Sequence, residues 1–179
     1  MQDRRQAIIE AGLEVLREHG FVGFTQPRVA ARAALRQSHL TYYFPTRLNL
    51  LEAVARAAID RQLAALDKVL VGSAKETGKS MAKMIGQHSN TRVMMALAQA
   101  SDQEVSLQKL FRELADGIVS RLGRFLKTLN ADSTEEHARL LHALAVGLAV
   151  VDLATARPDG AKRTSVVLET TLTLLENDK

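Results

Sequence analysis

The sequence of 179 residues lacks cysteine and tryptophan and contains three prolines and ten glycines. Without cysteine the chain can form no disulfide, no thiolate metal site and no cysteine nucleophile. The low proline and glycine content, together with 46% apolar residues, is typical of a mainly helical globular protein. The N-terminus, MQDRRQAIIEAG, passes directly into helical periodicity, unlike a secretory signal. We therefore expect a cytoplasmic protein.

Long hydrophobic runs are absent as well. The longest uninterrupted apolar run, from Ala143 to Val151, is bracketed by His142 and Asp152. It is far shorter than the about 20 residues that a membrane-spanning helix needs. We expect no membrane span and no membrane partner.

Motifs of catalysis are missing too. The five histidines, at positions 19, 39, 88, 137 and 142, form neither an i, i+4 pair for zinc nor a Glu-x-x-His pattern for a di-iron site. The sequence has no GxSxG elbow, phosphate-binding loop or dinucleotide fingerprint. We predict that the protein is not an enzyme and needs neither a metal ion nor another cofactor.

Acidic residues are missing from one long window, between Glu18 and Glu52, in a chain of net charge +4. A local excess of positive charge attracts polyanions such as DNA, although an ordinary solvated surface is the alternative interpretation of any single arginine. The window holds four arginines and most of the aromatic residues: Arg28, Arg32, Arg36 and Arg47, with Phe21, Phe24, Tyr42, Tyr43 and Phe44.

The spacing of apolar residues in and before this window predicts three short helices, over residues 4–19, 27–33 and 37–44. Thr25 is suited to cap the second helix. In the third helix an apolar inward face opposes a polar outward face. Two helices joined by a tight turn, with a polar outward face on the second, are typical of a helix-turn-helix that enters the major groove of DNA.

Residues 5–54 resemble the DNA-binding domain of TetR-type transcriptional regulators. The similarity is carried by AIIEAGLEVLREHGFVGFT, by VAARAAL and above all by LTYYFPTRLNLLEAV. Two positions depart from the family pattern, since Ala34 replaces the usual glycine of the turn and Arg36 replaces serine or a similar cap. Glycine carries no Cβ penalty in the left-handed conformation. We therefore expect either strain at Ala34 or a different turn, in which the third helix starts as late as Ser38.

The outward face and the resemblance together predict the residues that contact DNA. Gln37 and His39 are expected to read base edges, and Arg36 to contact either bases or phosphates. The resemblance implies that Thr25 and Arg47 clamp phosphates at the two ends of the domain. The full predicted DNA-contacting set is Thr25, Gln26, Arg28, Arg36, Gln37, Ser38, His39, Thr41, Tyr42 and Arg47.

The remainder of the chain predicts six further helices and no strand. They are expected over residues 47–71, 74–87, 91–100, 103–129, 134–156 and 162–176. The fold should therefore be all-α with about nine helices. Residues 1–46 would form the helix-turn-helix DNA-binding domain, and residues 47–179 a six-helix domain for effector binding and dimerisation.

Four of the five methionines crowd into the fifth and sixth predicted helices. Methionine fills irregular apolar space, so a stripe of core residues is one interpretation. The resemblance implies another, a pocket for a small apolar or amphipathic effector. The predicted ligand-contacting set is Met84, His88, Met95, Gln99, Phe111 and His142.

The run ALAVGLAVV, in the helix expected over residues 134–156, is apolar around most of its circumference. Such a helix must be covered on all sides, either inside a monomer core or by a second copy of the chain. Pairing with the next helix, SVVLETTLTLL, across a two-fold axis gives a four-helix interface, which the resemblance also implies. The predicted dimer set is Leu144, Gly147, Leu148, Val151, Val167, Thr171 and Leu174.

These features predict a ligand-responsive, DNA-binding transcriptional regulator. We expect a repressor that binds a palindromic operator as a homodimer and is released by a small-molecule effector. The alternative is a helical protein that binds a small molecule or a protein partner without specific DNA binding.

Overall fold

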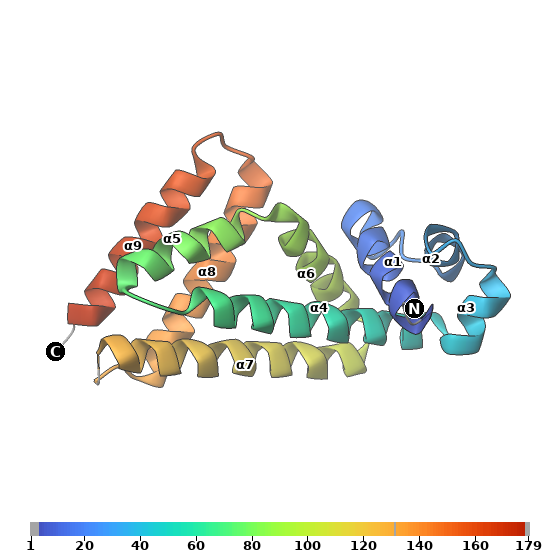
Figure 1. The fold of residues 1–179 in the computed structure, drawn as a ribbon, viewed down its shortest axis with the longest axis horizontal. Coiled ribbons are helices and arrows are strands. Elements are labelled where there is room, and N and C mark those ends of the chain that lie inside the picture. Colours follow the sequence, from blue (N-terminus) through green and yellow to red (C-terminus); the bar gives the residue numbers. More distant parts are fainter. Residues whose placement is uncertain (1–3, 131, 178–179) are drawn as a thin grey trace. The chain divides into compact units, whose positions relative to one another are not determined.

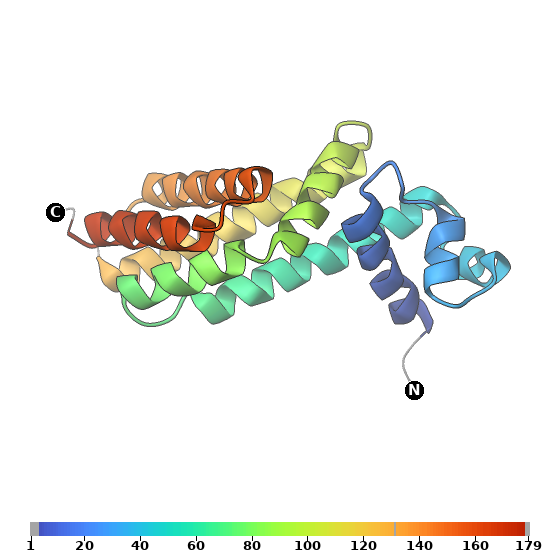
Figure 2. The same cartoon turned by 90° about the horizontal axis from the view of Figure 1, so that it is seen from above.

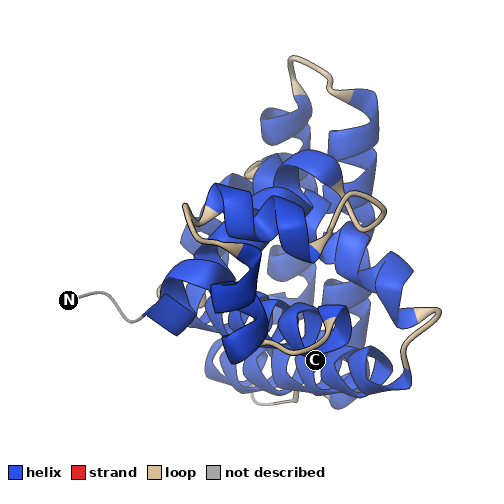
Figure 3. Cartoon of the chain, turned by 90° about the vertical axis from the view of Figure 1, so that its right-hand side faces the viewer, coloured by secondary structure: helices blue, strands red, loops and turns tan. Residues whose placement is uncertain are grey.

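The computed structural model describes residues 4–130 and 132–177. These residues form nine α-helices and no strand (Figures 1 and 3). The all-α prediction is therefore confirmed. The helices are α1 (Arg4–His19), α2 (Gln26–Arg32), α3 (Gln37–Tyr43), α4 (Arg47–Val69), α5 (Ala74–Ile85), α6 (His88–Ser101), α7 (Val105–Leu129), α8 (Glu135–Thr155) and α9 (Gly160–Asn177).

The helix bounds agree with the sequence prediction to within three residues. The largest difference is at α6, which begins at His88 and not at residue 91. The backbone N–H of Asn90 already bonds the carbonyl oxygen of Gln87. Asn90 therefore lies in the first turn of α6, and the prediction placed this helix start too late.

The described residues fall into two compact units. The first comprises the chain up to residue 61 together with residues 92–112, and the second comprises residues 62–91 and the chain from residue 113 onward. The boundary predicted after residue 46 lies inside the first unit, because α4 packs on α1 there: a Cβ at Gly12 would lie 2.5 Å from Cγ2 of Val54. The division into a DNA-binding and an effector region remains a functional prediction.

The core of the first unit joins α1, α2, α3 and the beginning of α4. Its fully buried side chains include Ile8, Leu16, Phe24, Leu40 and Leu50. Full burial of each such side chain stabilises the fold by roughly 1.5–3 kcal/mol relative to exposure. This core holds the short helices α2 and α3, which are too short to be stable by themselves.

The second unit has its own apolar core, formed by α5, α7, α8 and α9 with residues such as Met81, Leu126 and Leu172. α5 lies directly against α9 (Figures 1 and 2). A Cβ at Gly78 of α5 would lie 3.0 Å from backbone atoms of Glu169. The absence of a side chain at Gly78 thus permits the close approach of the two helices.

α8 is long and apolar enough, by length and composition alone, to cross a membrane, with a mean hydropathy of 1.6 over an 18-residue window. An uninterrupted apolar run does not reveal this property, because a single polar residue such as His142 ends the run but lowers the mean hydropathy little. Only 17% of that window is buried. α8 therefore carries an apolar surface that a single copy of the chain leaves uncovered.

Candidate nucleic-acid interface

The helix-turn-helix begins at α2, whose start is fixed by Thr25 as predicted. The Thr25 backbone is extended (φ −127°, ψ 148°), and its Oγ1 accepts a 3.4 Å hydrogen bond from the backbone N–H of Arg28. Pro27 occupies the first turn, where its missing N–H is harmless. Because Oγ1 acts as an acceptor in the cap, its proton remains available to an acceptor such as a phosphate oxygen.

The turn between α2 and α3 places Ala34 at φ 54°, in the left-handed region. This conformation costs a residue with a Cβ roughly 1–2 kcal/mol. Two backbone bonds hold the turn, from Ala34 N–H to the Ala31 carbonyl at 3.1 Å and from Leu35 N–H to the Ala30 carbonyl at 2.9 Å. The chain therefore keeps the backbone that a glycine would adopt, and Ala34 carries the strain.

α3 begins at Gln37 and its start does not shift to Ser38. Arg36 stands at the N-cap with an extended backbone (φ −70°, ψ 145°), and its side chain makes no capping hydrogen bond. The departure from the family pattern therefore replaces a short polar cap by an exposed guanidinium directly before α3.

α3 has a buried and an exposed face, as its sequence pattern predicts. Tyr42 is the most exposed of its aromatic residues, with 82% of its surface accessible, and its ring meets that of Tyr43 edge-on at a centroid distance of 5.2 Å. The inward residues are Leu40, Phe44 and the half-buried Tyr43, and the exposed residues are Gln37, Ser38, His39 and Tyr42.

Thr41 differs from the other polar residues of α3. It is half-buried, and its hydroxyl faces the carbonyl oxygens of Gln37 at 3.2 Å and Ser38 at 3.1 Å. These backbone acceptors satisfy its only proton. A contact from Thr41 to a phosphate would have to replace these intrahelical bonds.

Gln26 and Arg47, both in the predicted DNA-contacting set, have internal partners. Gln26 Nε2 donates to the carbonyl oxygen of Phe44 at 2.8 Å and ties α2 to the end of α3. Arg47 donates from Nε to the Phe24 carbonyl at 2.7 Å and from Nη2 to the Phe21 carbonyl at 3.0 Å. Its guanidinium carbon also lies 4.6 Å from the centroid of the Phe21 ring. The two side chains therefore hold the helix-turn-helix together.

The other arginines of the acid-free window are not equivalent. Arg28 Nη1 donates to the carbonyl oxygen of Gly23 at 2.7 Å. Arg32 pairs with Glu14 and Glu18 of α1, and its hydrogen bond lowers the pKa of the Glu18 carboxyl. Among the four arginines of this window, all within the described residues, only Arg36 has no internal partner.

Arg5 of α1 was not predicted as a functional residue. Its guanidinium carbon lies 5.3 Å from the centroid of the Phe44 ring. The fold therefore places the positive charge of Arg5, which lies near the start of α1, beside the C-terminal end of α3. The acid-free window did not reveal it, because Arg5 lies outside that window.

The six residues predicted to contact a ligand are divided between the two units. Met95, Gln99 and Phe111 belong to the first unit, and Met84, His88 and His142 to the second. Met95 is 46% exposed and Gln99 is also exposed, so neither is enclosed in a pocket of this chain.

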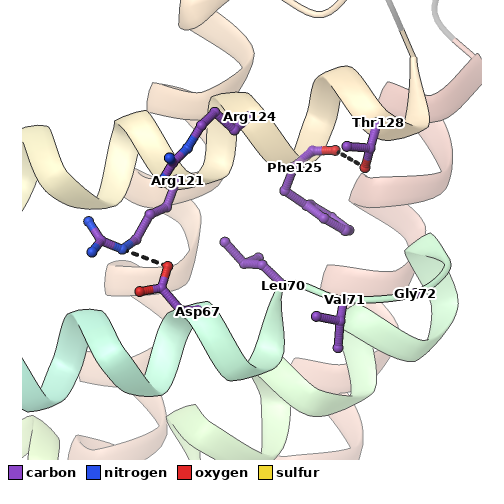
Figure 4. Close-up of a pocket in the computed structure, with 8 residues that line it drawn as sticks. All are labelled: Asp67, Leu70, Val71, Gly72, Arg121, Arg124, Phe125 and Thr128. Atoms are coloured by element: carbon purple, nitrogen blue, oxygen red, sulfur yellow. Dashed lines mark hydrogen bonds and ion pairs between the residues drawn. The ribbon is translucent and has the colours of Figure 1, made fainter.

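In the second unit, His88 Nε2 lies 2.8 Å from Oδ2 of the buried Asp152. Burial lowers the pKa of the half-buried His142. A pocket of about 260 Å³ lies elsewhere in this unit, between α4 and α7, and none of the six predicted residues lines it (Figure 4).

The predicted dimer residues lie on the surface or at its edge. Val151 is 57% exposed and Leu174 is 67% exposed, which excludes the alternative of a fully buried core helix. Around Gly147 an added Cβ would meet no atom within 4 Å. Gly147 and Val167 are also exposed, and Leu144, Leu148 and Thr171 are half-buried. Further exposed apolar residues, which the prediction omitted, are Leu140, Val146, Val150 and Val166.

Comparison with known families supports the helix-turn-helix assignment. Residues 8–54 match the model of the family described as bacterial regulatory proteins, tetR family. A search of curated proteins found no match.

Several solved structures share the fold over nearly the whole chain. A transcriptional regulator from Rhodococcus sp. Rha1 is 21% identical, with a TM-score of 0.84 over 96% of this chain and 95% of that chain. A TetR family member from Streptomyces coelicolor A3 is 25% identical, with a TM-score of 0.73 over 94% and 98%. The multidrug binding protein EbrR, in complex with proflavin, is 26% identical, with a TM-score of 0.67 over 94% and 99%.

The chain is therefore a DNA-binding transcriptional regulator of the helix-turn-helix class. Residues 8–54 match the tetR family, as the resemblance predicted, and members of this family are transcription factors and not enzymes.

Proposed function

We propose that the protein is a repressor that binds a palindromic operator as a homodimer and is released from it by a small-molecule effector. The observation that supports this most strongly is the presence of two exposed surfaces of opposite character. The outward face of α3 is polar, and the outward faces of α8 and α9 are apolar. The first suits a DNA groove and the second suits another copy of the chain.

On α3 the exposed side chains divide by chemistry. Gln37 and His39 carry groups that both donate and accept hydrogen bonds, which suits base edges in the major groove. Ser38 and Tyr42 carry hydroxyls, and Tyr42 is exposed enough to reach a phosphate. Arg36, whose guanidinium has no internal partner, supplies the cation at the N-terminal end of α3.

The other predicted DNA contacts act on DNA mainly by orienting α3. Gln26 and Arg47 are bonded to backbone carbonyls, and Arg28 to that of Gly23. Thr25 caps α2 and keeps its hydroxyl proton for a phosphate. Thr41 reaches DNA only by giving up its intrahelical bonds.

The dimer forms through α8 and α9. Across a two-fold axis the apolar patch of one copy contacts the same patch of the other copy. Each copy therefore covers exposed residues of the other, such as Val151 and Leu174. A dimer places two α3 helices on one duplex, and a two-fold protein requires half-sites related by the same symmetry. The operator is therefore a palindrome with half-sites about 10–10.5 base pairs apart, or a multiple of that.

A lipid bilayer suits the exposed apolar face of α8 less well than a second copy of the chain does. Glu135, Glu136 and Arg139 lie at its N-terminal end, and the buried Asp152 lies near its C-terminal end. A charged side chain within a bilayer costs several kcal/mol, whereas a protein interface can leave these groups at its rim. We therefore place the protein in the cytoplasm, with α8 covered by a second copy of the chain.

The effector is a small apolar or amphipathic molecule. The similar protein EbrR was solved with proflavin and with imidazole. In this chain α4 is a single helix from Arg47 to Val69 that contributes to both units, so a ligand in the second unit can act on the first through it. Release requires that the effector bind the non-binding state more tightly than the DNA-bound state.

Selection of bound fragments from the host genome tests this function against the alternative of a partner-binding protein without specific DNA binding. The purified chain should enrich fragments that share an inverted repeat, at physiological salt. The neighbouring genes would then indicate candidate effectors. Enrichment without a shared sequence, or none at all, would favour the partner-binding alternative.

A further inference from the structure

The pocket between α4 and α7 has charged and apolar walls (Figure 4). It lies in the second unit and is bounded by the C-terminal end of α4, by the turn that follows and by the last turns of α7. Its volume is about 260 Å³. The lining residues that matter chemically are Asp67, Leu70, Arg121, Arg124, Phe125 and Thr128.

The charged wall carries more positive than negative charge. Arg121 is fixed by two hydrogen bonds, from Nε to Oδ1 of Asp67 at 2.8 Å and from Nη1 to the Gly117 carbonyl at 3.1 Å. These bonds leave three of its five N–H groups without a partner, one on Nη1 and two on Nη2. Arg124, on the same helix, is exposed and has no partner among the described residues. One carboxylate therefore faces two guanidinium groups, and one positive charge remains uncompensated.

The apolar wall is formed by Leu70 and Phe125, which lie in the space between α4 and α7 (Figure 4). Phe125 belongs to the core of the second unit, and Leu70 packs against that core. The hydroxyl of Thr128 donates to the carbonyl oxygen of Phe125 at 2.6 Å. Its proton is thus used, and the pocket presents donors mainly from the two arginines.

We propose that this pocket binds a small aromatic monoanion of the aryl carboxylate class. The carboxylate would accept hydrogen bonds from Arg124 and from Nη2 of Arg121, while the ring would lie on Leu70 and Phe125. Guanidinium and carboxylate groups form the strongest class of protein hydrogen bond. The carboxylate of Asp67 disfavours a second negative charge on the ligand, and the two guanidinium groups disfavour a cation.

The size of the pocket restricts the ligand further. Pockets for drug-sized ligands have volumes of roughly 300–1,000 Å³, and this pocket is slightly smaller. A single substituted ring is therefore the expected size. Binding at this site stands by itself, but the role of the ligand as the effector rests on the proposed function.

Calorimetric titration of the full chain with benzoate and benzamide tests the site. The two probes have nearly the same shape, and only benzoate carries a charge. Benzoate should bind with one site per chain, and benzamide should bind at least about tenfold more weakly, because it lacks the charge-assisted bonds. Arg124→Ala should weaken benzoate binding by a similar factor. Lys127→Ala, which removes the same charge from an exposed position of α7 outside the pocket, should change it less than about twofold.

Three results would overturn the proposal. They are the absence of saturable benzoate binding, equal affinity for benzoate and benzamide, and equal losses in the two variants, which would indicate unspecific attraction of anions. Circular dichroism checks that both variants fold, which we expect because both positions are exposed.

The titration needs no DNA, so it separates this site from the proposed function. If benzoate binds as expected and also weakens operator binding in wild type but not in Arg124→Ala, the pocket is the effector site. If benzoate binds and operator binding is unchanged, the ligand site stands and its effector role is rejected. If the chain binds no operator, the proposed function fails while the calorimetric result still decides the site.

Discussion

Arg47 Nε donates a 2.7 Å hydrogen bond to the carbonyl oxygen of Phe24, which joins the first turn of α4 to the segment before α2. A second bond reaches the carbonyl oxygen of Phe21, whose ring lies beneath the guanidinium. The resemblance predicted that Arg47 contacts phosphates. Its hydrogen bonds to the two carbonyl oxygens indicate that it also stabilises the helix-turn-helix. Its loss should therefore affect stability as well as DNA binding.

Arg47→Ala is expected to lower the free energy of unfolding by about 1–3 kcal/mol, because two partly buried carbonyl oxygens lose a charged donor. Operator affinity should fall for all sequences alike. Urea unfolding of the variant measures the first effect. Tyr42→Phe serves as the control and should leave stability unchanged, since the Tyr42 side chain is exposed. A large loss of operator affinity in Arg47→Ala with wild-type stability would restrict Arg47 to a phosphate contact.

Arg36→Ala should reduce the dependence of operator affinity on salt. Each phosphate contact that is lost lowers the slope of log K against log salt concentration by about 1. Arg32→Ala removes the same charge, but Arg32 is already paired with Glu14 and Glu18. It should therefore leave the slope unchanged. Fluorescence anisotropy at several salt concentrations measures both slopes. If the two variants have identical slopes, the ion pairs of Arg32 with Glu14 and Glu18 do not prevent Arg32 from contacting DNA.

Ala34→Gly should stabilise the protein by up to about 1 kcal/mol, because it removes the Cβ penalty at φ 54° while adding some entropy to the unfolded chain. Ala33, the preceding residue, has φ −79°. Ala33→Gly should therefore destabilise the protein by roughly 0.5–1 kcal/mol. Thermal unfolding of the two variants distinguishes these signs. A lower melting temperature for Ala34→Gly would mean that Ala34 is not strained.

Gly147→Glu should convert the dimer to monomers and abolish high-affinity operator binding. An added Cβ at Gly147 meets no atom of the same chain within 4 Å, so the monomer itself should tolerate the change. Val22→Glu introduces the same charge at a position that is 82% exposed in the first unit, and it should remain dimeric. Sedimentation velocity reports the two masses. If the Gly147→Glu variant remains dimeric, the dimer does not form through α8. If the wild-type protein is monomeric and binds lipid vesicles, a membrane and not a second copy covers the apolar face of α8.

The sequence alone was sufficient for the fold class and for the division of α3 into two faces. Apolar residues spaced by helical periodicity, such as Leu40 and Phe44, locate the buried side, and Thr25 marks the start of α2. These signals are local, because caps and periodicity involve residues within one or two turns of each other. Strain at Ala34 was one of the two outcomes that the sequence left open, and the structure, with φ 54° at Ala34, has that one and not a different turn.

The hydrogen-bond and ion-pair partners of the polar side chains could not be predicted from such local signals. Arg32 bonds Glu18, 14 residues earlier, and Gln26 bonds the Phe44 carbonyl, 18 residues later. Such pairs depend on how the helices pack, so an acid-free window in the sequence does not give the charge of the folded surface. The ligand prediction depended on packing in the same way, since Met95 proved to be exposed.

The central claim is that the outward face of α3 reads an operator sequence. Selection of bound duplexes from a random pool, with wild type and with His39→Ala, tests it most directly. We predict an inverted repeat for wild type, and for the variant the same repeat with relaxed preference at one or two base pairs per half-site, at a cost of roughly 1–3 kcal/mol each. An identical motif and affinity for both proteins would contradict the claim that this face of α3 reads the bases.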